Sequence, residues 1–407
     1  MGVVNNIYQS KKHYLLILLP VFTLALIQVL AFHLYDGFIY ESSFKTKLSI
    51  TITYLVFILS LPFFVFLGSN IDTAHYSKIN NLGATLVVLA IIFAMYFLLK
   101  PAISLILMIF GGVDVAVLRE NFFHDQGLRS NLFGSGFMAA FVGAFVVPFI
   151  WVVVFFLVNE RSKWFSAAFY ILCAILIIYG VSAGGRFAIY FSMLAIYVRY
   201  LVIYGRITPR LVFSILVMFA LGVLIGLGRG IEGLLYSLFE YHIIQPFLLD
   251  QRLNHDFMQV YSVDIPFYAF LTNLFFPFYY VVNGSENMPV FQVGMYFSDF
   301  TLYSHLIGKN YNAYHTMFVF FYYDVGLYAP LLVIVFMFLL FFFMKMIRSG
   351  YLRIKYLSFL VFVLFHGLFQ GGPFNPVYMA VIVGFPLFSI LVLDSKYGKG
   401  KRNYSHL

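Results

Sequence analysis

The sequence predicts an all-α, polytopic integral membrane protein with about 10 to 12 transmembrane helices. Composition is the first observation behind this class: of 407 residues, 62% are hydrophobic, 21% are aromatic and only 10% are charged. The mean hydropathy of +0.93 is the second. A surface in contact with water cannot carry so much apolar area, so a bilayer must solvate most of the chain. The third is that long apolar stretches recur from one end of the chain to the other.

Nine of these stretches are candidates for crossing a bilayer, which takes about 20 residues of helix. They are residues 14–34, 48–68, 137–158, 164–181, 187–204, 211–227, 327–345, 356–369 and 375–393. The first follows Lys11 and Lys12, as the apolar region of a signal peptide would. It is long, however, and has no small-x-small cleavage site, so we expect an uncleaved first span.

Two further stretches leave the number of spans open. Residues 82–118 would measure roughly 55 Å as one helix, which exceeds one crossing, and Lys100-Pro101 interrupts them. Residues 265–282 are apolar but contain two prolines and an asparagine, which favours an interfacial or re-entrant segment. One crossing by the first stretch and none by the second gives about ten spans with both termini cytoplasmic. If the first stretch crosses twice and the second crosses once, the chain has about twelve spans. We favour the interpretation with ten.

Basic side chains orient the C-terminal half of the chain. They form two groups separated by two spans: Lys345, Arg348, Arg353 and Lys355, then Lys396, Lys399, Lys401 and Arg402. Under the positive-inside rule both groups are cytoplasmic. Residues 229–324 then lie outside, where their three basic and eight acidic side chains suit an external loop. The chain thus divides into N-terminal helices (1–228), an external loop with a re-entrant helix (229–324), and C-terminal helices with a basic cytoplasmic tail (325–407).

The sequence does not contain the motifs that several classes of function require. The net charge of +9 is explained by the same positive-inside rule, so no nucleic acid is expected. The chain has no P-loop lysine motif, no His-Glu-x-x-His and no Asp-x-Asp. ATP hydrolysis, zinc catalysis and metal-dependent transfer from a nucleotide-sugar are therefore unsupported, and neither a metal nor a cofactor is expected. The single cysteine, Cys173, excludes a disulfide within the chain.

Two arginines flank one predicted helical hairpin. Arg186 ends Gly184-Gly185-Arg186 before one apolar stretch, and Arg229 stands in Gly228-Arg229-Gly230 after the next. A helix that crosses and a helix that returns bring both arginines to the same face, which the orientation above makes external. A guanidinium is always charged and its planar fork matches phosphate oxygens. The pair, with Arg252 as a third external cation, indicates a site for the diphosphate of a membrane-borne substrate; contact with lipid headgroups is the alternative.

The external loop also contains candidates for a general base, namely Glu232, Glu240, His242, Asp250, His255, Asp256, Asp299, His305, His315 and Asp324. His315 and Asp324 stand out because they lie at the mouth of an entering span, where ionisable groups are functional candidates. They occur in Asn312-Ala-Tyr-His-Thr316 and in Phe320-Phe-Tyr-Tyr-Asp-Val-Gly326.

Taken in order, these motifs resemble the O-antigen (oligosaccharide repeat-unit) polymerase family, which is similar in plan to the O-antigen ligases. The motifs are Gly-Gly-Arg before one helix, Gly-Arg-Gly after the next, a long external loop, Asn-x-Tyr-x-Thr and Tyr-Asp-x-Gly, mainly within residues 180–330. The resemblance implies a GT-C-like plan and an inverting, metal-independent glycosyltransferase of lipopolysaccharide O-antigen biosynthesis. In that family, a growing chain passes from undecaprenyl diphosphate to a hydroxyl of the next lipid-linked unit, at the periplasmic face of the bacterial inner membrane.

The resemblance also implies roles and partners. Arg186 and Arg229 would bind the diphosphate, and His315 falls where the ligases place their base. The residues themselves add Arg252 as an assisting cation and Asp324 as an alternative base. The partners would be undecaprenyl-diphosphate-linked oligosaccharides as donor and acceptor, membrane lipid, and a chain-length regulator protein. Two other functions stay open. One is an O-antigen ligase, and the other is a flippase for the same lipid-linked sugar, which typically shows internal repeats and charged residues near the bilayer midplane.

Overall fold

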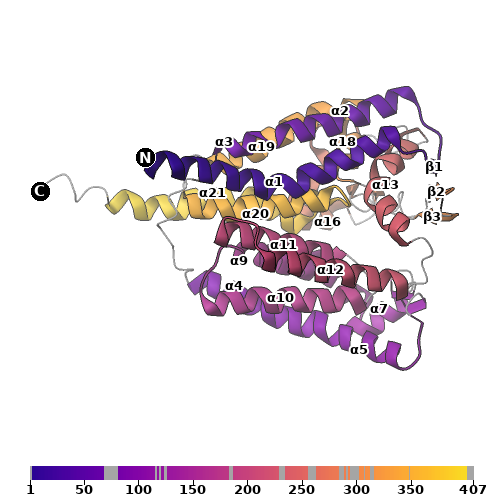
Figure 1. Ribbon diagram of the computed structural model, residues 1–407, viewed down its shortest axis with the longest axis horizontal. Helices are drawn as coiled ribbons and strands as arrows, with labels where there is room; N and C mark the ends of the chain where they lie inside the picture. The colour runs from indigo at the N-terminus through magenta and orange to yellow at the C-terminus, as the bar shows by residue number, and fades with distance from the viewer. Residues whose placement is uncertain are drawn as a thin grey trace, which may run out of the picture. The chain divides into compact units, whose positions relative to one another are not determined.

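The structure is a computed structural model (Figure 1). It describes residues 2–67, 81–114, 117–118, 121–122, 126–182, 187–228, 234–254, 263–283, 288–289, 292–293, 302–306, 308–311, 316–347 and 349–400. Seven helices of this part of the chain are long and apolar enough to cross a membrane: Lys11–Leu34, Phe44–Phe66, Gly83–Phe110, Gly136–Leu157, Lys163–Ser182, Phe187–Tyr204 and Phe318–Met346. The predicted helical class is confirmed, and the seven long apolar helices are compatible with a membrane protein. The total of about 10 to 12 spans stays a prediction.

Contacts between residues divide the chain into two compact units. Unit 1 contains Met1–Tyr76 and Tyr241–Leu407, and unit 2 contains Ser77–Glu240. Unit 2 is therefore an insertion within the sequence of unit 1. The three consecutive segments drawn from the sequence cut the chain differently, because a hydropathy pattern does not reveal that the first two helices pack with the last ones.

Unit 1 is a helical bundle built from both ends of the chain. α1 (Gly2–Leu34) and α2 (Phe44–Ser60) form a hairpin, which short α3 (Phe63–Phe66) continues. The second half of the chain adds α13 (Leu234–Asn254) from Tyr241 onward. It also adds α18 (Phe318–Val325), η4 (Gly326–Tyr328), α19 (Ala329–Met346), α20 (Gly350–Gly367), η5 (Gly372–Phe374) and α21 (Pro376–Gly400). α19 packs against α2 and α21, and α20 packs against α1.

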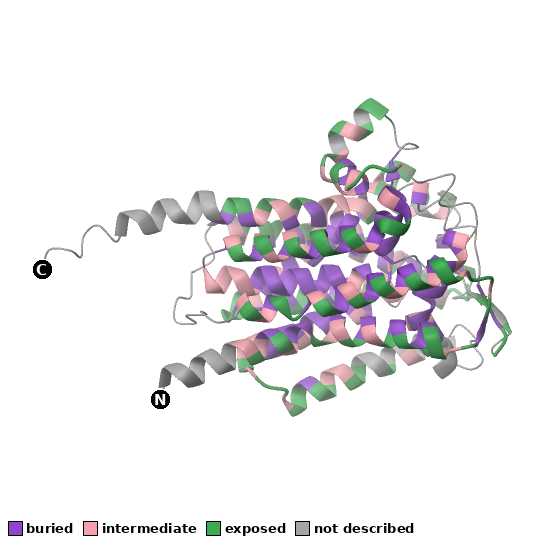
Figure 2. Ribbon diagram, turned by 90° about the horizontal axis from the view of Figure 1, so that it is seen from above, coloured by how far each residue is buried: buried purple, intermediate pink, exposed green. Residues whose placement is uncertain are grey.

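The burial pattern of these helices is that of a bundle solvated by lipid. Along α19, Val333, Phe336 and Leu340 are buried, whereas Leu331 and Phe338 are 60% and 65% exposed. Figure 2 shows the same alternation of buried and exposed faces along the helices. Large apolar side chains on the outer face are unfavourable in water and favourable in hydrocarbon, which agrees with a membrane location.

A small antiparallel sheet joins two distant segments at one end of unit 1. β1 (Phe38–Ile39) pairs with β2 (Leu302–Ser304), and β2 pairs with β3 (Lys309–Tyr311). Phe38 lies opposite Ser304. Because β1 follows α1 directly, the sheet fixes residues 302–311 to the turn between α1 and α2.

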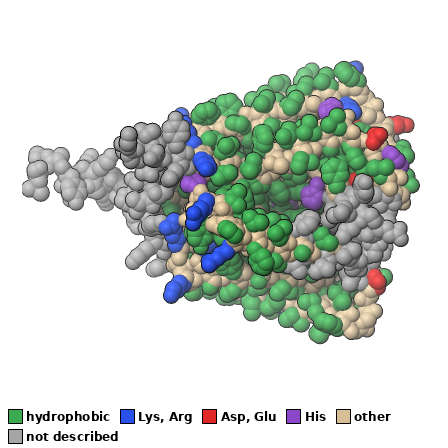
Figure 3. Space-filling view, viewed as in Figure 1, with side chains coloured by type: hydrophobic (Ala, Val, Ile, Leu, Met, Phe, Trp, Pro, Cys, Tyr) green, Lys and Arg blue, Asp and Glu red, His purple; other side chains and the backbone are tan. Residues whose placement is uncertain are grey.

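Charged side chains are distributed unequally between the two ends of unit 1. The end where α19 finishes and α20 starts carries Lys345 and Arg353, and the Arg353 guanidinium donates to the carbonyls of Leu67 and Ile347 at 2.9 and 2.7 Å. Figure 3 shows Lys and Arg side chains toward this end and Asp and Glu side chains toward the other. Lys45 in the first turn of α2 is a cation at the acidic end. The positive-inside rule predicts such a distribution when both termini face the cytoplasm.

Unit 2 contains two composite helices: α4 (Asn81–Phe93), η2 (Ala94–Leu99) and α5 (Lys100–Phe110), then α8 (Gly136–Phe141), η3 (Val142–Val146) and α9 (Val147–Leu157). Both η segments are π-helical, and Pro101 and Pro148 follow them. A proline removes one helical N–H and clashes with the carbonyl four residues earlier, and the wider π turn relieves that clash. The predicted interruption at Lys100-Pro101 is therefore wrong. Gly83–Phe110 is one apolar helix, as the ten-span interpretation requires.

The described part of unit 2 also contains α7 (Gln126–Phe133), α10 (Lys163–Ser182), α11 (Phe187–Tyr204) and α12 (Pro209–Gly228). Arg199, which the sequence analysis did not single out, fastens α11 to the turn before α10. Its guanidinium donates to the carbonyls of Leu157 and Glu160 at 2.8 and 3.0 Å, and to the Ser166 hydroxyl at 2.7 Å. Arg199 is 4% exposed, so these acceptors replace the water that its charge would otherwise need.

The second uncertain stretch forms two short helices in unit 1. α15 (Tyr268–Leu274) and α16 (Phe276–Asn283) are separated at Phe275, and neither is long enough to cross a bilayer. Phe267, before α15, has a left-handed backbone with φ of 62°. This geometry agrees with the interfacial or re-entrant interpretation of residues 265–282.

Candidate functional site

The predicted hairpin is present as α11 and α12, which pack against each other. Their observed bounds, Phe187–Tyr204 and Pro209–Gly228, match the predicted stretches to within two residues. Arg186 and Arg229 lie outside the described residues. Phe187 and Gly228, their neighbours in the sequence, end two antiparallel helices of similar length, so these two residues lie at the same end of the hairpin.

A close approach between α10 and α11 lies near that end. A Cβ added at Gly180 would stand 2.6 Å from the Cβ of Ala188. Real Cβ atoms do not come so close, so only glycine allows this helix contact. Gly180 therefore serves close packing of α10 against α11.

Arg252 and Asp324 belong to unit 1. His315 lies outside the described residues. Arg252, in the last turn of α13, is 0% exposed and has the largest volume among the fully buried side chains of the described residues. A guanidinium so enclosed is stable only where acceptors or anions meet it. Enclosure also strengthens its interaction with any anion that reaches it, because little water screens the charge.

Asp250 connects α13 to the turn between α1 and α2. Its carboxylate accepts hydrogen bonds from the Ser42 hydroxyl at 2.5 Å, from the Thr46 hydroxyl, and from the Asn254 amide at 3.2 Å. Burial raises the pKa of Asp250, and the hydroxyl hydrogen bonds and the Lys47 charge offset this rise only in part. The helix that carries Arg252 is thus fixed two residues before it.

Asp324 has a different arrangement. It is 0% exposed in α18, and its Oδ1 accepts the backbone N–H of Ala269 at 2.9 Å. The backbone of Phe267 provides a further hydrogen bond to the same carboxylate. Its Oδ2 has no hydrogen-bond partner among the described residues. Asp324 therefore anchors the start of α15 to α18.

The sequence analysis missed the polar face of α2. Thr46, Ser49 and Thr53 are all buried, and their spacing of three and four residues places them on one side of the helix. The hydroxyls of Ser49 and Thr53 each lie 3.0 Å from the Tyr322 hydroxyl, while Thr46 reaches Asp250. Hydroxyl residues at helical spacing were the available signal, since such a stripe marks a face that bonds to other helices in a membrane.

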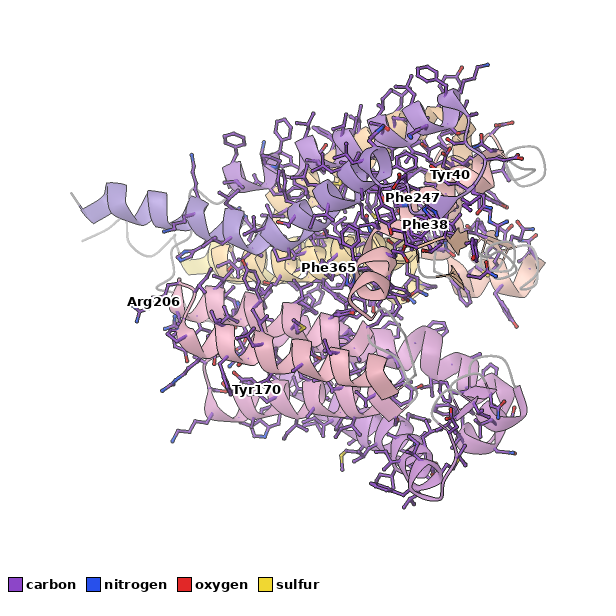
Figure 4. All side chains as sticks on the ribbon, turned by 45° about the vertical axis from the view of Figure 1, so that its right-hand side comes forward. Phe38, Tyr40, Tyr170, Arg206, Phe247 and Phe365 are labelled. Atoms are coloured by element: carbon purple, nitrogen blue, oxygen red, sulfur yellow. The ribbon has the colours of Figure 1, made fainter. Side chains whose placement is uncertain are left out.

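Aromatic rings pack around α13 close to Asp250. Phe247 of α13 packs edge-on against Phe32, Phe38 and Tyr40, with ring centroids 5.2, 5.0 and 5.6 Å away. Figure 4 labels Phe38, Tyr40 and Phe247 together in this part of unit 1. Burial and the nearby Asp250 carboxylate raise the pKa of Tyr40, so its phenol stays protonated.

Met317, directly before α18, packs against Gly367 at the end of α20. Met317 N–H donates to the Gly367 carbonyl at 2.6 Å, and a Cβ at Gly367 would stand 2.5 Å from Met317 Sδ and 2.8 Å from Pro373 Cδ. A side chain larger than that of glycine at residue 367 would therefore displace Met317 or Pro373.

Gly367→Ala is expected to displace Met317 and the start of α18, and so to lower activity about tenfold or more, because small displacements of positioned groups slow catalysis steeply. Gly384→Ala in α21 is the matched control, since nothing lies within 4 Å of its added Cβ. The initial rate of product formation by both variants checks this. Equal rates would mean that the Gly367 contact is irrelevant to the site.

Among the described residues, no group of three or more His, Cys, Asp or Glu side chains is placed to hold a metal ion. Comparison of the chain with protein-family models, with curated proteins and with solved structures found no match.

Proposed function

We propose that the protein is an O-antigen polymerase, an inverting glycosyltransferase that joins lipid-linked oligosaccharide repeat units at the external face of a bacterial inner membrane. The observation that carries the proposal is the enclosed Arg252, beside the anchored Asp250 and at the acidic end of unit 1. An arginine buried at a membrane boundary suits an anionic group presented by a lipid, such as a diphosphate.

The donor would bring its own activation, because neither ATP nor nucleotide-sugars are available outside the cytoplasmic membrane. The acceptor hydroxyl oxygen bonds to the anomeric carbon of the donor sugar as the bond from that carbon to the diphosphate oxygen breaks. Undecaprenyl diphosphate leaves with the bonding electron pair, and the hydroxyl proton passes to the base. Attack opposite the leaving group inverts the anomeric centre.

In this proposal Arg252 holds the diphosphate and stabilises the charge that develops on it. The same role for Arg186 and Arg229 stays a prediction from the sequence. His315 takes the proton. Asp324, the alternative base, is fully enclosed and already accepts the Ala269 N–H, which favours a positioning role for it. The polymer's length would be set with a separate chain-length regulator.

The experiment that tests the function combines purified protein in lipid nanodiscs with undecaprenyl-diphosphate-linked repeat units. A ladder of products that grow by one repeat unit is expected on a gel. Recovery of only the starting lipid-linked unit contradicts a polymerase.

Two further arms separate the alternatives. Adding lipid A-core as a second acceptor identifies a ligase if the sugar moves to it instead of to another repeat unit. Transfer of labelled lipid across a liposome membrane without a new glycosidic bond identifies a flippase.

A further inference from the structure

A chain of buried hydrogen bonds crosses unit 1 between α1 and α2. Gln28 of α1 and Tyr54 of α2 are both 0% exposed. The Tyr54 hydroxyl donates to Gln28 Oε1 at 3.1 Å and is also hydrogen-bonded to the Thr316 side chain. Polar side chains inside membrane helices are unfavourable unless paired, and they are functional candidates where they occur.

The Gln28 amide reaches two other elements. Its Nε2 lies 3.0 Å from the His242 carbonyl, 3.0 Å from Gln245 Oε1 and 3.2 Å from the Leu368 carbonyl. The first two acceptors belong to α13, and the third follows the end of α20. One side chain thus fastens α13 to the end of α20.

The Tyr54 side chain holds the start of α18. Its ring packs edge-on against Phe318, with centroids 4.8 Å apart. Its hydrogen-bond partner Thr316 is next to His315 and accepts the Phe318 N–H at 3.0 Å. The hydroxyl of Tyr54 therefore connects to the residue that directly follows the proposed base.

We propose that Gln28 and Tyr54 are positioning residues that fix Thr316 and the start of α18, which follow the proposed base in the sequence, relative to the Arg252 helix, an inference that rests on the proposed function. Gln245 precedes Arg252 by two helical turns, about 10 Å along α13. The network therefore runs from the residue after the base to the helix that presents the cation. Transfer to a hydroxyl needs both groups in register, and a misplacement of about 1 Å slows such a reaction about a hundredfold.

The variant that tests this is Tyr54→Phe, which removes one hydroxyl and keeps the ring contact with Phe318. Two control variants come from the same unit. Tyr14→Phe removes a buried hydroxyl that has no hydrogen-bond partner among the described residues. Tyr356→Phe removes an equally buried hydroxyl that donates to the Ile382 carbonyl at 2.7 Å, outside the network.

Tyr54→Phe is expected to lower kcat about tenfold or more with little change in KM for the lipid-linked unit, because the start of α18 is displaced while the Arg252 side chain is unchanged. Both control variants should stay within about twofold of the wild type. Thr316→Ser, which keeps the hydroxyl, should retain activity. Thr316→Val should lower kcat at least as much as Tyr54→Phe, because it also removes the acceptor of the Phe318 N–H. Equal losses in Tyr54→Phe and Tyr356→Phe would overturn the inference, since a lost buried hydrogen bond alone would then explain both.

Hydrogen–deuterium exchange separates this inference from the polymerase proposal. Exchange at residues 316–320 and 242–248 should be faster in Tyr54→Phe than in Tyr356→Phe, in nanodiscs and without substrate. If the wild type makes no polymer, the polymerase proposal fails, and the exchange rates still decide the coupling. Equal exchange in the two variants would show that the network does not hold these segments.

Discussion

Arg252→Lys is expected to reduce polymer formation about a hundredfold while the protein still inserts and folds. Lysine keeps the positive charge but loses the planar fork that binds two phosphate oxygens at once. Because Arg252 is 0% exposed, no bulk water can replace the lost hydrogen bonds. Removing one such donor from a preorganised site typically slows a reaction by about a hundredfold to a thousandfold. The initial rate of ladder formation, at saturating lipid-linked unit, measures the effect.

Arg206→Lys is the matched control. Arg206 is exposed in the turn between α11 and α12 (Figure 4), so water already solvates its guanidinium. The change to lysine should therefore leave the rate within about twofold of the wild type. Thermal melting of both variants reports whether folding is intact. An Arg252→Lys protein with a normal melting temperature and more than half of the wild-type rate would remove Arg252 from the proposed diphosphate site.

Asp324→Ala is expected to destabilise unit 1 and abolish activity. The Ala269 N–H would lose its acceptor, which costs about 1–3 kcal/mol for a buried donor, and the missing carboxyl would leave a cavity. Asp324→Asn has nearly the same shape and keeps an oxygen in position to accept that N–H. We therefore expect its stability to stay close to that of the wild type and its rate to fall by less than about tenfold.

The ratio between these two variants identifies the role of Asp324. A positioning residue gives a severe effect for alanine and a mild one for asparagine. A general base gives a severe effect for both, because an amide cannot take a proton. Loss of activity in a normally folded Asp324→Asn protein would therefore assign the base to Asp324 and not to His315.

Hydropathy predicted most of the helices because a bilayer requires every spanning segment to be an apolar helix of about 20 residues. The α11–α12 hairpin follows from two apolar stretches and a short turn, and its bounds were close to those observed. Proline rules were less successful. Pro101 was expected to interrupt a helix, yet a π-helical segment before it keeps the helix continuous. Both π-helical segments precede a proline, so the local signal was present, but Pro101 was interpreted as a break in the helix.

The site was predicted only in part, because its residues meet through tertiary contacts. Arg252 and Asp324 were selected for their charge, and both are enclosed at the acidic end of unit 1. Asp250 was only one of ten equivalent acids and histidines until its contacts with Ser42 and Thr46 set it apart. Gln28 and Tyr54 are single polar residues in apolar stretches, and nothing near them in the sequence names their partners.

The discontinuous sequence of unit 1 has a consequence for its biosynthesis. α1 and α2 leave the ribosome long before their partners, because Gln28 bonds to Gln245 and Leu368, which are 217 and 340 residues later. At a translation rate of about 5–20 residues per second, the last partner arrives roughly 20–70 s after Gln28. During that interval the nascent hairpin carries unpaired polar groups in lipid, while all of unit 2 is made. Transient protection of this hairpin, by the insertion machinery or by a chaperone, is therefore part of what the fold requires of the cell.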